Sequence, residues 1–328
     1  MSFSREILKI DADSTISDIV AIIRKQVLEI MHRRGVVIGL SGGIDSSVCA
    51  ALCVRALGKE NVLALFMPER NSSNEALTLG NLIAKSLGVQ AITEDITLIL
   101  EAAGCYSRQV KAIRKVFPEY DYNWKCKVSI PSIIKSDRLN ILRLTVESPI
   151  GEQKSTRMSL SAYLELIAAM NWKQRTRKMM EYHHADRLNY AVCGTPNRLE
   201  YDQGFFVKNG DGSADFKPIA HLYKTQVYTL AKALGIPKDI IDRPPTTDTY
   251  SLYQTQEEFY FALPYDKMDL CLYGHNHRIS PTDVAPIVEL SSEQVERVYK
   301  DIESKRRGTH YLHLPPLLIE PVSEIQNH

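Results

Sequence analysis

The 328-residue sequence predicts an α/β fold in which helices flank a doubly wound parallel sheet. Residues 35–40 form a continuous, mostly β-branched apolar run, which is typical of a central strand buried on both faces. Strand-like runs and helix-length amphipathic segments then alternate, and this alternation favours parallel βαβ units. The expected elements here are a helix at 14–33 with Ser14 as its N-cap, helices at about 45–57 and 74–87, and strands at 62–67 and 89–96.

The second part of the chain is less regular. Residues at about 100–160 form a predicted insert without a recognisable pattern, in which 125–130 and 140–146 are interpreted as short strands of a hairpin. Helices are expected at about 161–190 and 224–234, with a strand at 190–193. No linker divides the sequence, so residues 1–328 are expected to form one domain. Residues 244–265 are interpreted as a long polar loop, and we expect a lid there because long loops in compact proteins are commonly functional.

Composition and charge argue against several classes of protein. Lys and Arg total 40 against 39 for Asp and Glu, so no nucleic-acid partner is expected. The N-terminus lacks a basic segment followed by an apolar run, and no stretch approaches the roughly 18 apolar residues of a membrane span. We therefore expect a cytoplasmic protein with no membrane partner. The six cysteines contain no CxxC pair, unlike those of a zinc site or a small disulfide scaffold.

The loop Ser41–Ser47, with the sequence SGGIDSS, follows the first predicted strand and leads into a predicted helix. Its glycines allow a tight turn and a close backbone approach, and its serine hydroxyls lie where backbone amides and the helix dipole favour an anion. These features predict a cradle for the pyrophosphate of ATP. Asp45 beside a pyrophosphate would be repelled unless a cation intervened, so it is the natural Mg²⁺ ligand. The simpler alternative, a Gly-Gly turn before a serine-capped helix, leaves the additional serines and the aspartate unexplained.

The loop resembles the signature of the N-type ATP pyrophosphatases, which cleave ATP between the α- and β-phosphates and form an adenylated intermediate. Four further motifs follow in order, and with the loop they resemble the ammonia-dependent NAD synthase family. The motifs are NWKQRTR at 171–177, GTPNRLE at 194–200, GFFVKNGDGSAD at 204–215 and LYKTQV at 222–227. The resemblance covers nearly the whole chain apart from the insert, and it implies an adenine nucleotide alpha-hydrolase-like fold.

The resemblance also implies roles for individual residues. Glu200 would join Asp45 on Mg²⁺, since this cation takes one or two carboxylates when it lies between phosphates. Lys224 would neutralise phosphate charge, and Lys224, Asp45 and Asp211 are the implied catalytic residues. The implied ATP-binding residues are Gly39, Ser41, Gly42, Gly43, Asp45, Ser46, Ser47, Thr195, Lys224 and Thr246. The implied substrate-binding residues are Arg175, Arg177, Lys208, Asp211 and Asp215.

The implied reaction has two steps. A substrate carboxylate, nicotinate adenine dinucleotide in this family, attacks the α-phosphate of ATP, and ammonia then displaces AMP to form an amide. ATP and Mg²⁺ are the implied cofactors. About 35 residues before the loop are too few for the amidase domain of glutamine-dependent members, so we expect no glutaminase domain, and nitrogen would come from free ammonia or a separate glutaminase. The family implies a homodimer, with the helix at about 161–190 in its interface.

Two regions depart from the family pattern. The family shows Gln-Thr-Asp-Glu followed by Glu-Leu-Gly after the proline-threonine loop, whereas this chain has QTQEEFYFALPY at 254–265. The insert at about 100–160 is also longer than expected. These differences leave open an amide ligase of the same fold that acts on another carboxylate. An RNA-modifying ATP pyrophosphatase is a further alternative, although the sequence has neither a paired-Cys motif nor a basic stripe.

Overall fold

A computed structural model describes residues 3–129, 142–246, 250–261 and 263–322. Its central feature is a parallel four-stranded sheet with the strand order β3-β2-β1-β7. The strands are β1 (Val36–Gly39), β2 (Val62–Phe66), β3 (Gln90–Thr93) and β7 (Ala191–Val192). The first strand pairs in parallel with both β2 and β7, so the apolar run at 35–40 is central, as its composition predicts.

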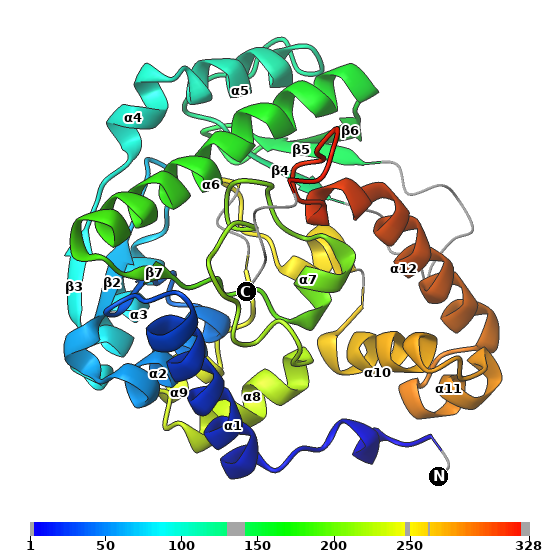
Figure 1. Ribbon diagram of the computed structural model, residues 1–328. Helices are drawn as coiled ribbons and strands as arrows, with labels where there is room; N and C mark the ends of the chain where they lie inside the picture. Colours follow the sequence, from blue (N-terminus) through cyan, green and yellow to red (C-terminus); the bar gives the residue numbers. More distant parts are fainter. Residues whose placement is uncertain (1–2, 130–141, 247–249, 262, 323–328) are drawn as a thin grey trace.

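Helices cover both faces of this sheet, which confirms the predicted fold class (Figure 1). Val36 and Ile38 face a core that they share with α1 (Ala12–Arg24), α2 (Ile44–Leu57), α3 (Asn74–Leu87) and α8 (Lys224–Ala233). Val37 faces the opposite side, where Ala185 of the long helix α6 (Leu160–Leu188) packs against it. Alternate residues of β1 thus point to different helical layers, as expected for a strand buried on both faces.

The first helix begins earlier than the sequence predicts. The side chain of Asp11 accepts a hydrogen bond from the backbone amide of Ser14, so Asp11 is the N-cap and the prediction of Ser14 was wrong. A carboxylate at this position satisfies one of the unpaired amides of the first turn. After α1 the helix continues as the π-helical segment η2 (Lys25–Ile30).

The predicted insert contains a second, antiparallel sheet with the order β4-β5-β6. The predicted hairpin strands correspond to β4 (Lys125–Ser129) and β5 (Arg143–Glu147), which pair with each other. The sequence missed β6 (Gln153–Arg157) and the helices α4 (Thr97–Ala102) and α5 (Cys105–Arg114). Residues 130–141, which include parts of both predicted strands and their connection, lie outside the described residues. Helix α6 extends from the parallel sheet to this insert, where Leu166 and Met170 join the insert's apolar core (Figure 1).

The C-terminal helices α10 (Tyr265–Asn276), α11 (Pro281–Val288) and α12 (Ser292–His313) form a third cluster around their own apolar core. The remaining short elements are η1 (Arg5–Leu8), η3 (Lys59–Asn61), α7 (Arg198–Gln203), α9 (Lys238–Ile241) and the π-helical turn η4 (Glu257–Phe261). Across the described residues, no helix combines the length and apolar character of a membrane span.

The prediction of a long polar loop at 244–265 was wrong at several positions from residue 250 onwards. Tyr250, Gln254, Phe261 and Leu263 are buried, and η4 adds a helical turn. Thr246 and Thr255 form an isolated antiparallel bridge. The aromatic residues that depart from the family pattern therefore pack against neighbouring elements, while residues 247–249 and 262 lie outside the described residues.

Candidate active site

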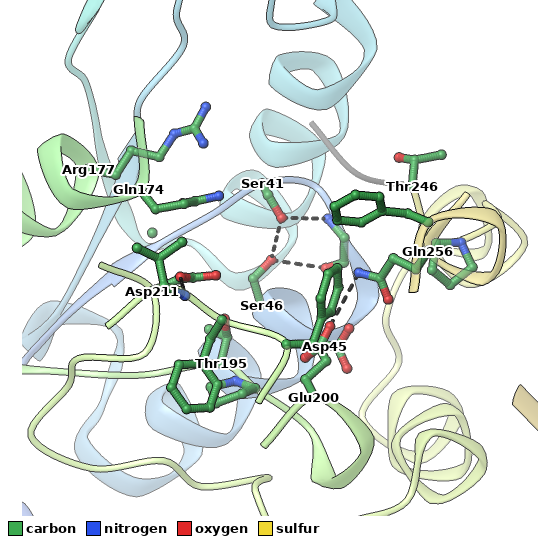
Figure 2. A pocket seen from close by; sticks show the side chains of 18 of the residues that line it. Ser41, Asp45, Ser46, Gln174, Arg177, Thr195, Glu200, Asp211, Thr246 and Gln256 are labelled. Atoms are coloured by element: carbon green, nitrogen blue, oxygen red, sulfur yellow. Dashed lines mark hydrogen bonds between the residues drawn. The ribbon is translucent and has the colours of Figure 1, made fainter. Parts of the chain in front are cut away.

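A cavity of about 670 Å³ lies beyond the carboxyl ends of β1, β2 and β7, where ligands bind in parallel α/β sheets. Helices α3, α6 and α12 and the segment that contains Gln256 also line it. In Figure 2, Gln174, Arg177 and Asp211 lie on one side of the loop serines, and Thr246 and Gln256 lie on the other. Much of the lining comes from residues 39–41, 43–46, 65–68, 193–196, 204–207 and 243–246.

The Ser-Gly-Gly loop is held close to α3. Gly42 has a φ of +73°, and a β-carbon there would lie 2.8 Å from the carbonyl oxygen of Ala76 and 2.8 Å from the β-carbon of Leu79. Only glycine accommodates both the backbone angle and this approach. The hydroxyl of Ser46 donates to the carbonyl oxygen of Gly43 at 3.0 Å and lies 3.4 Å from the hydroxyl of Ser41. The loop thus brings two hydroxyl groups to the cavity at the N-terminus of α2.

Asp45, in the first turn of α2, forms an ion pair with Lys224 at the start of α8. The Lys224 side chain is fully buried. Burial opposes its charge, but Asp45 and Glu200 outweigh this effect and raise the pKa of Lys224, so the ammonium form is retained. The other carboxylate oxygen of Asp45 accepts a hydrogen bond of 3.1 Å from the side-chain amide of Asn197. Asp269 on α10 accepts hydrogen bonds from the backbone amides of Lys224 and Thr225, which fixes the start of α8.

Glu200 lies beside this pair on α7. Its backbone amide donates to the Asn197 side chain, and its carboxylate accepts from the Asn197 backbone amide at 3.1 Å, which forms a capping box. Its other oxygen accepts a hydrogen bond of 3.3 Å from the side chain of Gln256. Burial, followed by repulsion from Asp45, raises the pKa of Glu200 to about 8. Asp45 thus disfavours the charged form of Glu200, and a cation between the two carboxylates would relieve this repulsion.

The donor set fits Mg²⁺ when phosphate oxygens are also present. Asp45 and Glu200 both line the cavity next to the phosphate-type loop. No group of three or more His, Cys, Asp or Glu side chains in the described part of the chain could hold a metal ion alone. Mg²⁺ commonly binds through one or two carboxylates together with substrate phosphates and water, and this combination matches the two residues.

A second charged cluster lines the cavity where α6 faces the end of β1. Lys178 and Glu181, both on α6, form a buried ion pair of 2.5 Å. Burial raises the pKa of Glu181, with Lys178 acting in the opposite direction. Asp211 lines the cavity. The surrounding protein desolvates its carboxylate and thereby raises its pKa. One carboxylate oxygen accepts a hydrogen bond of 2.7 Å from the backbone amide of Val207. Arg177 reaches the same side and donates to the carbonyl oxygen of Met67.

Most of the site residues suggested by the sequence line the cavity. They are Gly39, Ser41, Gly43, Asp45, Ser46, Arg177, Thr195, Glu200, Asp211, Lys224 and Thr246. Gly42 and Ser47 belong to the same loop but do not reach the wall, and the Ser47 hydroxyl donates to the carbonyl oxygen of Gly43.

Three expected substrate-binding residues are not brought to the cavity. Arg175 donates to the carbonyl oxygen of Lys208, and Lys208 donates to the carbonyl oxygens of Tyr311 and Leu314 at the end of α12. The carboxylate of Asp215 accepts from the backbone amide of Val192 and from the hydroxyl of Tyr182. In this structure these three side chains are therefore engaged in contacts within the protein.

Sequence reasoning missed Lys178, Glu181 and Gln256, which all line the cavity. The first two lie three positions apart on a predicted helix, the spacing at which oppositely charged side chains meet. That spacing indicates an ion pair but not where it faces. Gln256 lies in the segment that departs from the family pattern, but nothing local in the sequence indicates its contact with Glu200, which is 56 positions away.

A parallel α/β sheet with a Ser-Gly loop entering a helix N-terminus, beside a buried Lys-Asp pair, defines the class of the molecule as a nucleotide-binding protein. A model of the NAD synthase family matches residues 15–121 and 133–311. An NH(3)-dependent NAD(+) synthetase of Mesorhizobium japonicum is 59% identical over 97% of this chain and 99% of its own length. That of Thermotoga neapolitana is 35% identical over 87% of this chain and 90% of its own length. The chain belongs to the NAD synthase family.

Solved structures show the same fold at lower sequence identity. The NH3-dependent NAD synthetase of Campylobacter jejuni, solved with a nitrate ion, has a TM-score of 0.62 at 22% identity and covers 95% of this chain and 100% of its own. The NMN synthetase of Francisella tularensis has a TM-score of 0.63 at 22% identity, with 96% and 100% covered. The parallel sheet flanked by helices is thus common to all three molecules.

Proposed function

We propose that the chain is an ATP-dependent amide ligase that makes NAD from nicotinate adenine dinucleotide and ammonia, releasing AMP and pyrophosphate. The main support is the family membership, with a relative named NH(3)-dependent NAD(+) synthetase that is 59% identical over 99% of its own length. One observation in the structure carries the proposal: Asp45, Glu200 and Lys224 line the same cavity beside the Ser-Gly loop.

In the first step the substrate carboxylate attacks the α-phosphorus of ATP, and pyrophosphate leaves. The loop at 41–47 would hold the phosphates through its backbone amides and the hydroxyls of Ser41 and Ser46. Lys224 retains its charge because Asp45 and Glu200 face it, and its buried ammonium would stabilise negative charge on the phosphates during transfer. Positioning and electrostatics supply most of the catalysis of such transfers, so the step requires no protein nucleophile.

Asp45 and Glu200 are the residues that would hold Mg²⁺. When bound there, Mg²⁺ would neutralise charge on the phosphate oxygens and the leaving pyrophosphate. Glu200 is oriented for this by its capping box with Asn197, and Asp45 is oriented by Asn197 and Lys224. The same contacts keep both carboxylates turned toward the cavity side of the loop.

In the second step ammonia attacks the adenylated carboxyl carbon and AMP leaves. Water is the competing nucleophile, so the cavity must shield this carbon. Apolar side chains of the insert, α6 and the adjoining segment form part of the wall, including Leu142, Ile167, Met170 and Phe259. Arg177 and Asp211 line the opposite side of the cavity and would contact the anionic and hydrogen-bonding groups of the acid substrate. Arg175, Lys208 and Asp215 would need to exchange their present contacts to do so.

A homodimer is also part of the proposal. On α6, Leu164, Trp172 and Met179 are exposed by 55%, 39% and 54% and lie near one side of the helix. An apolar stripe of this kind is typical of an interface. Arg175 lies between Trp172 and Met179 on the chain and is exposed too, so a partner subunit would cover it. The cytoplasmic location and the separate glutaminase expected from the sequence stay predictions.

The direct test is product formation from ATP, Mg²⁺, ammonium and nicotinate adenine dinucleotide, with nicotinate mononucleotide and other carboxylates in parallel. We expect NAD, AMP and pyrophosphate in equal amounts with the dinucleotide and little AMP from the other acids. A preference for another carboxylate would replace the proposed substrate but retain the ligase. AMP release driven by tRNA alone would favour the RNA-modifying alternative.

A further inference from the structure

The antiparallel sheet of the insert holds the segment that carries Gln256. Within the described residues β4 is an edge strand, and residues 251–254 run along its free side. The amide of Cys126 donates to the hydroxyl of Ser251 at 2.9 Å, and the amide of Leu252 donates to the carbonyl oxygen of Cys126 at 3.0 Å. The side chain of Gln254 donates to the carbonyl oxygen of Val128 at 2.7 Å. These bonds fix the segment in register with β4.

Apolar packing reinforces this attachment. Tyr250 is buried in the core that β4 and β5 share with α5 and α6, and Phe259 packs against the same core. The rings of Tyr250 and Phe259 lie 5.6 Å apart in an edge-to-face arrangement. Residues on both sides of Gln256 are therefore anchored on the insert rather than on the parallel sheet.

Gln256 reaches from this anchored segment to the ATP side of the cavity. Its side-chain amide donates to Glu200 at 3.3 Å, and its carbonyl oxygen accepts from the hydroxyl of Tyr265 at 2.5 Å. Its backbone amide donates to the carbonyl oxygen of Pro245 at 3.1 Å, one residue before Thr246. The amide group of Gln256 is thus oriented from both ends. A donor of this kind stabilises a carboxylate, whereas a carboxylate in its place would repel Glu200.

We propose that Gln256 is a positioning residue that orients Glu200 for Mg²⁺-ATP, and that the antiparallel insert serves to hold Gln256 in place. The inference rests on the proposed function. It gives a role to the insert, which contributes few side chains of its own to the cavity. Groups that orient a metal ligand commonly affect metal affinity or activity by about 10- to 100-fold when removed.

The test is equilibrium binding of ATP at graded Mg²⁺ concentrations, measured by calorimetry on the full chain. For Gln256→Leu we expect the Mg²⁺ concentration that gives half-maximal ATP binding to rise about tenfold, with ATP affinity in the absence of Mg²⁺ unchanged. Gln254→Leu should shift this Mg²⁺ concentration in the same direction by a smaller factor and speed amide exchange at residues 251–256, because the segment loses one of its three bonds to β4. Thermal unfolding of each variant checks that the chain is folded.

Tyr253→Ala is the matched control, because Tyr253 lies in the same segment and is 68% exposed. It should leave the Mg²⁺ dependence unchanged. A wild-type Mg²⁺ dependence in Gln256→Leu would overturn the inference, and so would an equal loss of ATP affinity with and without Mg²⁺. The binding test needs no nicotinate substrate, so failure of the wild-type protein to make NAD would reject the proposed function while leaving this test intact.

Discussion

The two sheets serve the cavity in different ways. Three strands of the parallel sheet end at the cavity, and the residues that follow them include Ser41, Asp45 and Thr195. Among the described residues of the antiparallel insert, Leu142 alone lines the cavity. The parallel sheet thus supplies polar groups directly, whereas the insert supplies a wall and an attachment for the segment with Gln256. Asn197 and Lys224 orient Asp45 beside the parallel sheet, and the segment attached to the insert adds the contact of Gln256 with Glu200.

The largest expected effect lies in the parallel sheet, at Asp45. We expect Asp45→Ala to abolish ATP-to-AMP turnover, a loss of about a thousandfold or more, because both a charge and the partner of Lys224 are removed. Asp45→Ala leaves Lys224 buried without its carboxylate partner, which could also affect folding. Asp45→Asn therefore serves as a second variant, because it removes the charge but keeps the size and shape of the side chain. Turnover is measured by AMP release. Asp239→Asn, on the exposed side of α9, should behave like wild type, and wild-type turnover in both Asp45 variants would contradict the site assignment.

The junction between the two regions contains a buried ion pair. Lys173 on α6 pairs with Glu69 at 2.8 Å, and the hydroxyl of Tyr106 on α5 donates to the same carboxylate. We expect Lys173→Met to reduce the free energy of unfolding by about 3 to 5 kcal/mol, since it leaves a buried carboxylate without its cation. Adding Glu69→Gln to Lys173→Met should recover much of the lost free energy of unfolding, because no unpaired carboxylate then remains buried. Urea denaturation measures both.

The matched control for this junction is the surface pair of Lys115 and Glu165, which also links the α5 region to α6. Lys115→Met should cost about 1 kcal/mol or less, because the pair is exposed to solvent. Equal losses for Lys173→Met and Lys115→Met would contradict the expectation that breaking the buried pair costs more than breaking the exposed one.

Gly42 tests the close contact of the loop with α3. Gly42→Ala should lower stability by about 3 kcal/mol and weaken ATP binding at least about tenfold, because the new methyl group meets Ala76 and Leu79 at a positive φ. Gly235 has a nearly equal φ of +72°, but a β-carbon there would meet nothing within 4 Å. Gly235→Ala should therefore cost only the backbone strain, about 1 to 2 kcal/mol, and leave ATP affinity intact. If both variants bind ATP equally well, the loop contact is unimportant.

A pH dependence of stability is expected at Asp269. Burial raises its pKa from 3.8 to about 6, although hydrogen bonds from Thr225 and Lys224 oppose the shift. The folded state therefore holds this proton more tightly than the unfolded state, so stability falls as the pH rises from about 4 to about 6. The fall should be roughly 2 to 3 kcal/mol. Asp269→Asn should lose this pH dependence in urea titrations at pH 4 and pH 7, and an identical dependence in both proteins would contradict the assignment.

Local patterns were sufficient to predict the parallel sheet. The helix α3 (Asn74–Leu87) begins and ends where its apolar spacing predicts, and β1 is recognisable because a strand buried on both faces is apolar throughout. The insert gave weaker signals because its strands pair with each other, and the apolar core that they share with α5 and α6 forms only in the folded chain. Its third strand β6 is largely exposed and polar, so no hydrophobic period marks it.

The sequence predicted cavity-lining residues best where a motif directly follows a predicted strand. Arg175 and Arg177 show the limit of a motif alone. Residues two apart on a helix do not share a face, so one of these two side chains had to point away from the cavity, and it is Arg175. Gln256 depends on its attachment to β4, and only the folded chain brings it to Glu200.

Following the oxygen atoms of the acid substrate tests the central claim most directly. Nicotinate adenine dinucleotide labelled with ¹⁸O in its carboxylate would be converted with ATP, Mg²⁺ and ammonium, and the products examined by mass spectrometry. Attack of the carboxylate on the α-phosphorus requires one labelled oxygen to leave with AMP and the other to remain in the amide of NAD. Label in pyrophosphate, or AMP without label, would contradict an adenylated intermediate in this cavity.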